Sequence, residues 1–223
     1  MFEGKVMQAT QQLRQKFQSQ WDIATDHAFC RELADGTLPI EKMKWYLAQD
    51  YQFIDRFVRL LATAIAHAPS LADSVPAAQF LAVITGPENT YFLRSFDALN
   101  MTEEERNLAP APETTAFQNL MYEAQTSGRY EQMLAVLVVA EWTYLSWAER
   151  YENYDENLPF WFSEWIDLHC GEGFEGVVNY LRDQLDKAWD NLDDAQRAKA
   201  EEMFGKAVDC EVDFFNASYQ SRT

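Results

Sequence analysis

Apolar side chains recur at intervals of three and four residues between Leu38 and Pro69, which is the spacing of one face of a long helix. The positions on this face are Met43, Leu47, Ile54, Phe57, Leu61 and Ile65. Where the spacing calls for another apolar residue, between Leu47 and Ile54, the chain has Asp50. A carboxylate on a buried face loses hydration and persists only where something offsets that cost. We therefore predict a long helix that turns one carboxylate inward.

Two later helical patterns contain the same exception. Glu141 interrupts an apolar face between Tyr130 and about Asn153, and Glu211 interrupts another between Asp193 and Tyr219. A single inward acid is usually a core group that a neighbouring side chain satisfies. Three inward acids in one small domain would repel one another unless they share protons or surround a polar ligand. The pattern therefore favours a polar pocket inside a helical bundle.

The remaining segments also have helical periodicity, with Gly and Pro at their breaks. The expected helices cover residues 2–19, a short segment after Trp21, 76–98, a capped turn from Thr102, 114–127, 158–169 and 174–191. Gly86-Pro87 should kink or interrupt the helix that contains it. No segment of useful length alternates as a strand does. We predict a single all-α domain over residues 1–223, a bundle of eight to ten helices.

Composition and charge narrow the class of protein. Hydrophobic residues make up 48% of the chain and aromatic residues 14%, which is ample for a core. The formal net charge of −18 repels phosphate backbones and anionic lipid, so we expect neither nucleic acid nor membrane as a partner. We expect no signal peptide, because the first residues are polar. No apolar run is long enough to span a bilayer, and Cys30, Cys170 and Cys210 have no paired spacing. We expect free thiols in a cytoplasmic protein.

Two possible cofactor motifs in the chain lack the features that such sites need. Residues 171–176 fit G-x-G-x-x-G, but a helix precedes them and two acids within them would oppose a pyrophosphate. A carboxylate-bridged di-iron site commonly uses Glu-x-x-His, and His27, His67 and His169 have no such spacing. We therefore predict no metal and no other cofactor.

Several aromatic residues lie near the inward acids in helical projection. These residues are Phe53, Tyr122, Trp142 and Tyr144. Most aromatic residues at helical spacing belong to the core. A carboxylate flanked by aromatic rings is also how a flat heterocycle is sandwiched and hydrogen-bonded, so we predict that these rings line the pocket.

Several runs of residues resemble the TenA-like (thiaminase II) family over nearly the whole chain. They are Asp35-Gly36-Thr37-Leu38-Pro39, Trp45-Tyr46-Leu47-Ala48-Gln49-Asp50-Tyr51, Met121-Tyr122, Glu141-Trp142-Thr143-Tyr144 and the helix of Glu211. The resemblance implies a heme-oxygenase-like all-helical fold and a homo-oligomer, either a tetramer or a dimer. It also implies a pocket for the aminopyrimidine half of thiamin or its breakdown products.

The resemblance carries site roles over to individual residues. Asp50 matches the acid that holds the pyrimidine amino group and ring nitrogen. This edge of the pyrimidine offers two hydrogen-bond donors, which suit the two oxygens of a carboxylate. Tyr122 and Tyr144 match pocket tyrosines. Glu211 matches the acid beside the scissile exocyclic bond.

The chain departs from the better-known branch of the family at three positions. Phe53 and His169 stand where that branch has tyrosines, and Ala140 stands where it has the catalytic cysteine, with Glu141 next along the chain. The chain is thus similar to the cysteine-less branch with a glutamate, which is linked to aminopyrimidine and formamidopyrimidine salvage. Without a thiolate there is no covalent pyrimidinyl-cysteine intermediate, so cysteine-dependent cleavage of thiamin is not expected.

The sequence therefore predicts a hydrolase of thiamin salvage that acts on an amino- or formylamino-methylpyrimidine. Glu141 and Glu211 would straddle the exocyclic C–N bond as general acid and base, in an order that the sequence leaves open. One alternative is a non-catalytic pyrimidine-binding or regulatory protein, and another is an oxygenase of the wider fold group. A degenerate site has no reason to place a new carboxylate in an apolar face, so Glu141 favours the enzyme.

Overall fold

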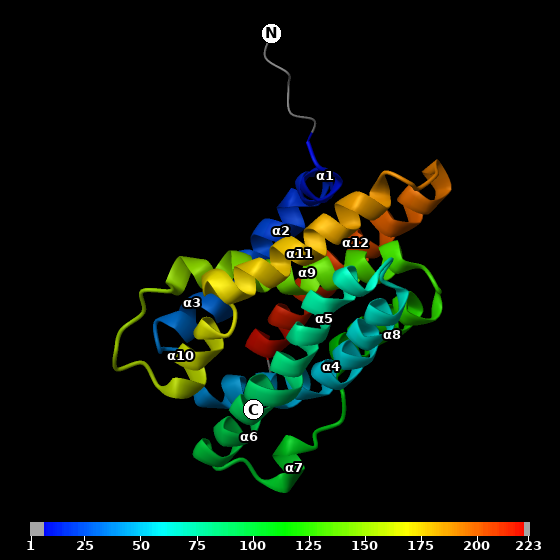
Figure 1. Cartoon of the computed structure of the whole chain (residues 1–223). Helices are drawn as coiled ribbons and strands as arrows, with labels where there is room; N and C mark the ends of the chain where they lie inside the picture. Colours follow the sequence, from blue (N-terminus) through cyan, green and yellow to red (C-terminus); the bar gives the residue numbers. More distant parts are fainter. Residues whose placement is uncertain (1–6, 221–223) are drawn as a thin grey trace.

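The structure is a computed structural model that describes residues 7–220, and every regular element in that range is a helix (Figure 1). The α-helices are α1 (Ala9–Lys16), α2 (Gln18–Thr25), α3 (Ala28–Ala34), α4 (Ile40–His67), α5 (Leu71–Val83), α6 (Asn89–Ala98), α7 (Glu103–Arg106), α8 (Pro112–Thr126), α9 (Tyr130–Ala148), α10 (Phe160–Asp167), α11 (Gly171–Trp189) and α12 (Asp194–Gln220). A π-helix, η1 (Ile84–Glu88), joins α5 to α6, and a short 3-10 helix, η2 (Glu149–Tyr151), follows α9. The predicted all-α class is confirmed.

The predicted number of eight to ten helices is too low for the described residues. The expected helix over residues 2–19 breaks at Phe17 into α1 and α2, and its residues 2–6 lie outside the described range. The helix expected over 76–98 begins earlier, at Leu71, because the Ser70 hydroxyl accepts a hydrogen bond from the Asp73 amide and caps the first turn.

Helix α9 forms the centre of the bundle. Every residue from Glu131 to Ala148 is buried, because α9 packs against α2, α4, α8, α11 and α12 (Figure 1). A helix covered on all sides is apolar around its whole circumference, and the run from Met133 to Ala140 fits that rule. The carboxylate of Glu141 therefore enters the interior from the most enclosed helix of the molecule.

Helix α4 follows the sequence pattern closely. Gly36 adopts a left-handed backbone (φ 71°) that ends α3, and Pro39 stands at the cap position of α4. No Gly or Pro interrupts the next 28 residues, and the helix ends just before Pro69. Asp50 is only 4% exposed, so the predicted inward carboxylate is buried.

The Gly86-Pro87 pair produces a π-helix. Within η1 the backbone widens to the i to i+5 pattern, and Glu88, its last residue, is buried with Ile84. The predicted interruption is confirmed, and its form is a widened turn that keeps α5 and α6 in one continuous path. Such π-turns often occur at functional sites.

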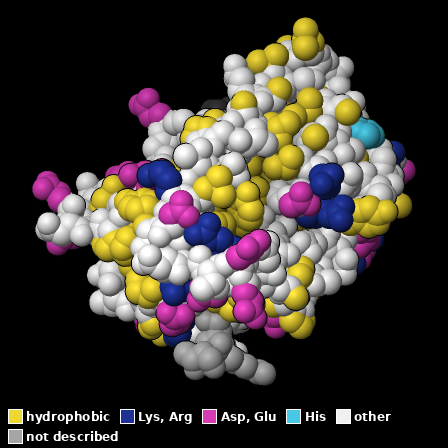
Figure 2. All heavy atoms as spheres, turned by 90° about the horizontal axis from the view of Figure 1, so that it is seen from below, with side chains coloured by type: hydrophobic (Ala, Val, Ile, Leu, Met, Phe, Trp, Pro, Cys, Tyr) yellow, Lys and Arg dark blue, Asp and Glu magenta, His cyan; other side chains and the backbone are white. Residues whose placement is uncertain are grey.

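On the surface, charged side chains of opposite sign lie close to one another. Figure 2 shows one face on which Lys and Arg side chains lie beside Asp and Glu among scattered apolar groups. Typical pairs are Arg106 with Asp97 at 2.7 Å and Arg59 with Asp55 at 3.2 Å. Exposed pairs of this kind contribute little to stability.

Over residues 7–220, none of the helices is both long enough and apolar enough to cross a lipid bilayer.

Candidate active site

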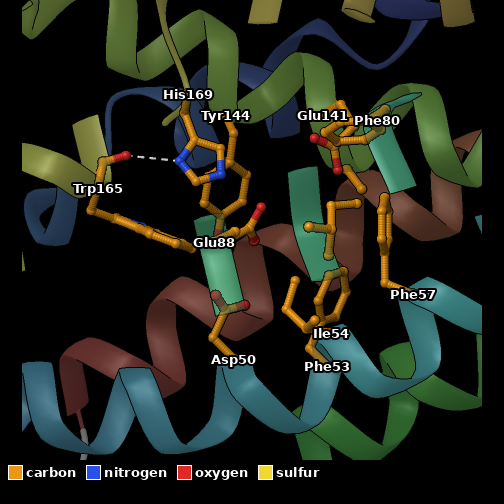
Figure 3. A pocket seen from close by; sticks show the side chains of 12 residues that line it. Asp50, Phe53, Ile54, Phe57, Phe80, Glu88, Glu141, Tyr144, Trp165 and His169 are labelled. Carbon is orange, nitrogen blue, oxygen red and sulfur yellow. Dashed lines mark hydrogen bonds between the residues drawn. The ribbon is translucent and has the colours of Figure 1, made fainter. Parts of the chain in front are cut away.

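A small cavity lies between α4, η1, α9 and α10, beside the centre of the bundle (Figure 3). Its lining residues are Asp50, Phe53, Ile54, Phe57, Phe80, Ile84, Glu88, Ala140, Glu141, Tyr144, Trp165 and His169. The cavity volume is about 20 Å³, which is room for about one water molecule. A six-membered ring needs more space, so ring binding requires the lining side chains to move apart.

Three carboxyl groups line this cavity. In Figure 3 the side chains of Asp50, Glu88 and Glu141 are directed toward the same space, although they come from α4, η1 and α9. Each carboxyl is close enough for its charge to act on another: Glu88 raises the pKa of Asp50, and both raise the pKa of Glu141. The structure thus brings together two of the acids predicted from the sequence and adds a third.

Glu211 lies close to this group but outside the lining. Its side chain, on α12, is 1% exposed, and burial followed by the charges of Asp50 and Glu141 raises its pKa well above the ordinary value. One carboxyl oxygen, Oε1, is buried without a hydrogen-bond partner among the described residues. A buried polar atom left unpaired costs free energy, so a polar group that reaches Glu211 would be bound favourably.

Burial is the main cause of the altered acidity in the cavity. It raises the pKa of Glu88 to about 8 and, together with neighbouring charge, raises the pKa values of Asp50 and Glu141 well above their ordinary range. None of the three carboxyls has a hydrogen bond or ion pair with another described residue among the causes of its shift. A raised pKa favours the protonated carboxyl, and a cation that enters the cavity favours the ionised form.

Aromatic rings form the rest of the wall. The Phe53 ring packs edge-on against Phe117 with the ring centroids 4.9 Å apart, and the Tyr144 hydroxyl shares a 2.7 Å hydrogen bond with the Tyr46 hydroxyl. Tyr46 in turn accepts a 3.1 Å hydrogen bond from Trp165 Nε1. This chain of bonds fixes the Tyr144 ring at the cavity wall, where a flat ligand could stack.

His169 lines the cavity in its neutral form. Its Nδ1 lies 2.8 Å from the Trp165 carbonyl oxygen, an acceptor, so Nδ1 carries the proton and Nε2 is left as an acceptor. Burial lowers the pKa of His169 to about 4. The ring therefore supplies no positive charge to balance the three carboxyls at neutral pH.

Two of the aromatic residues predicted to line the pocket lie elsewhere. Tyr122 is 53% exposed, and its ring contacts the Arg56 guanidinium, because the neighbouring Met121 occupies the inward position of α8. Trp142 is buried, but its ring lies between the guanidinium groups of Arg14 and Arg182, at 4.9 and 3.8 Å.

The reason for both misplacements is the helical turn of about 100° per residue, which directs the side chain next to an inward residue sideways or outward. We therefore correct the expected positions of Tyr122 and Trp142 and keep Phe53, Tyr144 and His169 as pocket residues.

A second, open hollow of about 350 Å³ adjoins the cavity. Its lining includes Tyr51, Asp55, Val58, Thr85 and Asn89, and it shares Ile54 and Ile84 with the cavity. These two side chains are therefore the wall between the cavity and the hollow. If Ile54 and Ile84 move apart, a ligand can pass from the hollow to the carboxyls.

Sequence reasoning missed Glu88 and Trp165. For Glu88 a signal was present, because Phe80, Ile84, Glu88 and Phe92 follow one another at intervals of four, with the acid where an apolar residue is expected. For Trp165 there was none, since its place in the wall depends on how α10 packs. Within residues 7–220, no group of three or more His, Cys, Asp or Glu side chains has the arrangement of a metal site.

Comparisons with known proteins agree on a family and a fold. The sequence profile of the TENA/THI-4/PQQC family matches residues 14–221. An aminopyrimidine aminohydrolase from Bacillus subtilis is 26% identical to the chain, over 96% of this chain and 91% of its own length.

Solved structures show the same fold. A TenA homologue from Pyrococcus furiosus superposes with a TM-score of 0.85 at 20% identity, over 94% of this chain and 99% of its own. A domain with a heme oxygenase-like fold from Shewanella denitrificans has a TM-score of 0.67 at 13% identity, over 97% of this chain and 94% of its own. The resemblance inferred from the sequence and the heme-oxygenase-like fold that it implied are confirmed.

Proposed function

This chain belongs to the TENA/THI-4/PQQC family, and on that premise we propose that it is a hydrolase of thiamin salvage that releases ammonia from an aminopyrimidine. The Bacillus subtilis relative named aminopyrimidine aminohydrolase supports this reaction class. The observation that carries the proposal is the convergence of the buried carboxyls of Asp50, Glu88 and Glu141 on one cavity with aromatic walls.

We assign the binding of the ring to Asp50 and the aromatic walls. The Asp50 carboxylate accepts hydrogen bonds from the ring's amino group and from a protonated ring nitrogen, a donor pair that matches two carboxylate oxygens. Phe53 and Tyr144 cover the faces of the ring, and His169 Nε2 accepts a further hydrogen bond. The ligand thereby offsets the hydration that the Asp50 carboxylate loses in the cavity.

The chemical step uses Glu141 and Glu211. One carboxylate takes a proton from water as the water oxygen bonds to the exocyclic carbon. The C–N bond breaks with the nitrogen already protonated, either before binding or by the other carboxylic acid, so that the nitrogen leaves as ammonia. The products are ammonia and the corresponding hydroxymethylpyrimidine. Burial and mutual charge raise the pKa values of both groups, which keeps one of them protonated at neutral pH as the step requires.

The reaction does not pass through a cysteine. Ala140 lines the cavity at the position matched to the catalytic cysteine of the better-known branch, and Cys30, Cys170 and Cys210 are absent from the lining. Burial raises the pKa of the Cys30 thiol, which lowers its thiolate content further. We therefore expect activity that survives thiol alkylation under native conditions.

A direct assay tests the function. The purified protein is incubated with aminomethylpyrimidine or with its N-formyl derivative, and ammonia and formate are measured. We expect ammonia from aminomethylpyrimidine, and formate only if the amide is also a substrate. Absence of both products, with the ligand nonetheless bound, would favour the non-catalytic binding protein.

We also propose that the protein works in the cytoplasm as a homo-oligomer, a dimer or a tetramer. Exposed apolar side chains on α5, among them Leu71 (82% exposed), Val75 and Val83, suit a contact between copies. Light scattering of the purified protein measures the assembly, and a mass equal to that of one chain at micromolar concentration would contradict it.

A further inference from the structure

Glu88 has no role in the chemistry described above, yet it stands in the middle of the site. Its carboxyl lies between those of Asp50 and Glu141 in Figure 3 and lines the same cavity. It is 6% exposed, and desolvation alone accounts for its altered acidity, so no described side chain donates to it or neutralises it. An acid maintained in this state lowers stability unless a ligand compensates.

The π-helix holds Glu88 in position. The four-residue interval between Ile84 and Glu88 places both side chains on the cavity side of η1. The next residue, Asn89, accepts a 2.9 Å hydrogen bond from the Tyr51 hydroxyl of α4, and Thr90 donates a 3.0 Å hydrogen bond to the Gly86 carbonyl. The carboxyl is thus presented by an anchored turn rather than by a loose loop.

The charge balance of the cavity favours a cation. Its lining contains three carboxyl groups and neither Lys nor Arg, and His169 is neutral. Asp50 suits the amidine-like edge of the ring and Glu141 suits the exocyclic bond, which leaves Glu88 facing a ligand without a stated partner. A neutral ligand would leave that carboxyl either protonated or buried as an unpaired charge.

We propose that Glu88 binds the positively charged exocyclic nitrogen of the substrate, and that the site therefore selects a primary amine in its ammonium form over a neutral amide or alcohol on the same ring. The inference rests on the proposed function and names the substrate class within it. The ammonium can donate to the Glu88 carboxylate in a charge-assisted hydrogen bond, which a formylated nitrogen or a hydroxyl group cannot match. An aminomethylpyrimidine is then a better ligand than its N-formyl derivative.

Calorimetric titration tests this directly with two ligands that differ in charge. Aminomethylpyrimidine is the cationic probe and hydroxymethylpyrimidine is the neutral one. Every titration uses a Glu211→Gln background, so that the amine is not hydrolysed to the alcohol during the measurement. We expect Glu88→Gln to weaken binding of the cation by about 10- to 100-fold and to change binding of the alcohol by less than about 3-fold. Glu88→Asp retains the charge and should keep most of the preference. The matched control is Glu131→Gln, a buried acid of α9 that is paired with Arg129 at 2.7 Å and lies outside the cavity lining.

Equal losses for both ligands in Glu88→Gln, or none for either, would overturn the inference. If that variant does not fold, the Glu211→Gln protein with Glu88 intact still decides, because binding of the alcohol as tightly as the amine contradicts selection by charge. The outcome is separable from the proposed function. Ammonia release by the wild type with no charge preference in binding rejects only the role of Glu88, whereas a charge preference without ammonia release rejects only the hydrolase.

Discussion

Gln49 and Asp50 are neighbours on α4, both buried and both polar, and their surroundings differ completely. Gln49 Nε2 donates to the Ala109 carbonyl at 3.1 Å, and its Oε1 accepts hydrogen bonds from the Ala111 amide at 2.8 Å and the Thr114 hydroxyl at 2.7 Å. Its side chain thereby fastens the start of α8 to α4. The Asp50 carboxyl is surrounded by cavity and by other carboxyls.

The difference separates two reasons for placing a polar group in a core. A buried group whose partners are complete stabilises the fold, because every donor and acceptor lost to water is replaced. A buried group without partners among its neighbours lowers stability, and its retention indicates a ligand that completes the site. On this view Gln49 is structural, whereas Asp50, Glu88, Glu141 and Glu211 are functional. Substitutions at the two kinds of position should therefore have opposite effects on stability and on activity.

The largest effect is expected from Glu141→Gln and Glu211→Gln. Each removes one partner of the acid–base pair, so kcat for ammonia release should fall by about 10² to 10⁴. The thermal midpoint should be no lower than that of the wild type, because an amide replaces an acid that had no partner among the described residues. Glu131→Gln, on the helix of Glu141, is the control and should retain kcat. Undiminished turnover in both active-site variants would refute the assigned chemistry.

Gln49→Ala should have the opposite signature. The Ala111 amide and the Thr114 hydroxyl lose their acceptor while they remain largely buried, which predicts a loss of about 2–4 kcal/mol in the free energy of unfolding. Affinity for the pyrimidine per mole of folded protein should change little. Chemical denaturation and calorimetric titration measure the two quantities. A variant that is stable but no longer binds the pyrimidine would place Gln49 in the site and contradict its structural role.

Asp50→Asn should weaken binding of the aminopyrimidine by about 10- to 100-fold, because a neutral amide replaces the charged acceptor of two hydrogen bonds. Stability should not decrease. Asp55→Asn, on the exposed side of α4 where Asp55 pairs with Arg59, is the matched control and should bind as the wild type does. Unchanged affinity in Asp50→Asn would remove Asp50 from the site.

The pH dependence of stability provides a smaller effect with a defined sign. Glu88 binds its proton more tightly when folded, since burial raises its pKa from 4.5 to about 8. Folding therefore takes up a proton between these values, and the free energy of unfolding should fall as pH rises through this window. In Glu88→Gln the free energy of unfolding should decrease by at least about 1 kcal/mol less over this pH window than in the wild type. Denaturation from pH 5 to pH 8 checks it, and parallel curves for the two proteins would contradict the burial of an unpaired acid.

The smallest effect is expected at Tyr122. Its ring is 53% exposed and contacts Arg56, so Tyr122→Ala should leave kcat/KM within about 2-fold of the wild type. The change tests the corrected position, because both the helical projection and the resemblance predicted a pocket tyrosine. A loss of tenfold or more in kcat/KM would restore Tyr122 to the substrate site.

The sequence predicted the fold class and part of the site, for reasons visible in particular residues. Asp50, Glu141 and Glu211 were found because each interrupts a regular apolar face, and the structure places all three in the interior. Glu88 interrupts a face in the same way, but the nearby Gly86-Pro87 suggested only a break, and a π-turn that continues the path leaves no clear signature in the sequence.

Other parts of the site depend on packing between helices. The hydrogen bond between Tyr144 and Tyr46 joins helices that are about a hundred residues apart in the sequence. The place of Trp165 in the wall depends on how a helix with only a loose sequence pattern packs. Trp142 was misplaced because it is next to Glu141 in the sequence. A helical projection alone does not show which face of the helix lines the pocket and which face packs against another helix.

A crystal structure with aminomethylpyrimidine bound is the most direct test of the central claim that the buried carboxyls form one site for a cationic ring ligand. We predict the ring between Phe53 and Tyr144, its amidine edge on Asp50, and its exocyclic nitrogen within hydrogen-bond distance of Glu88. A ring bound outside this cavity, or bound with its exocyclic nitrogen turned away from every one of the carboxyls, would contradict the account.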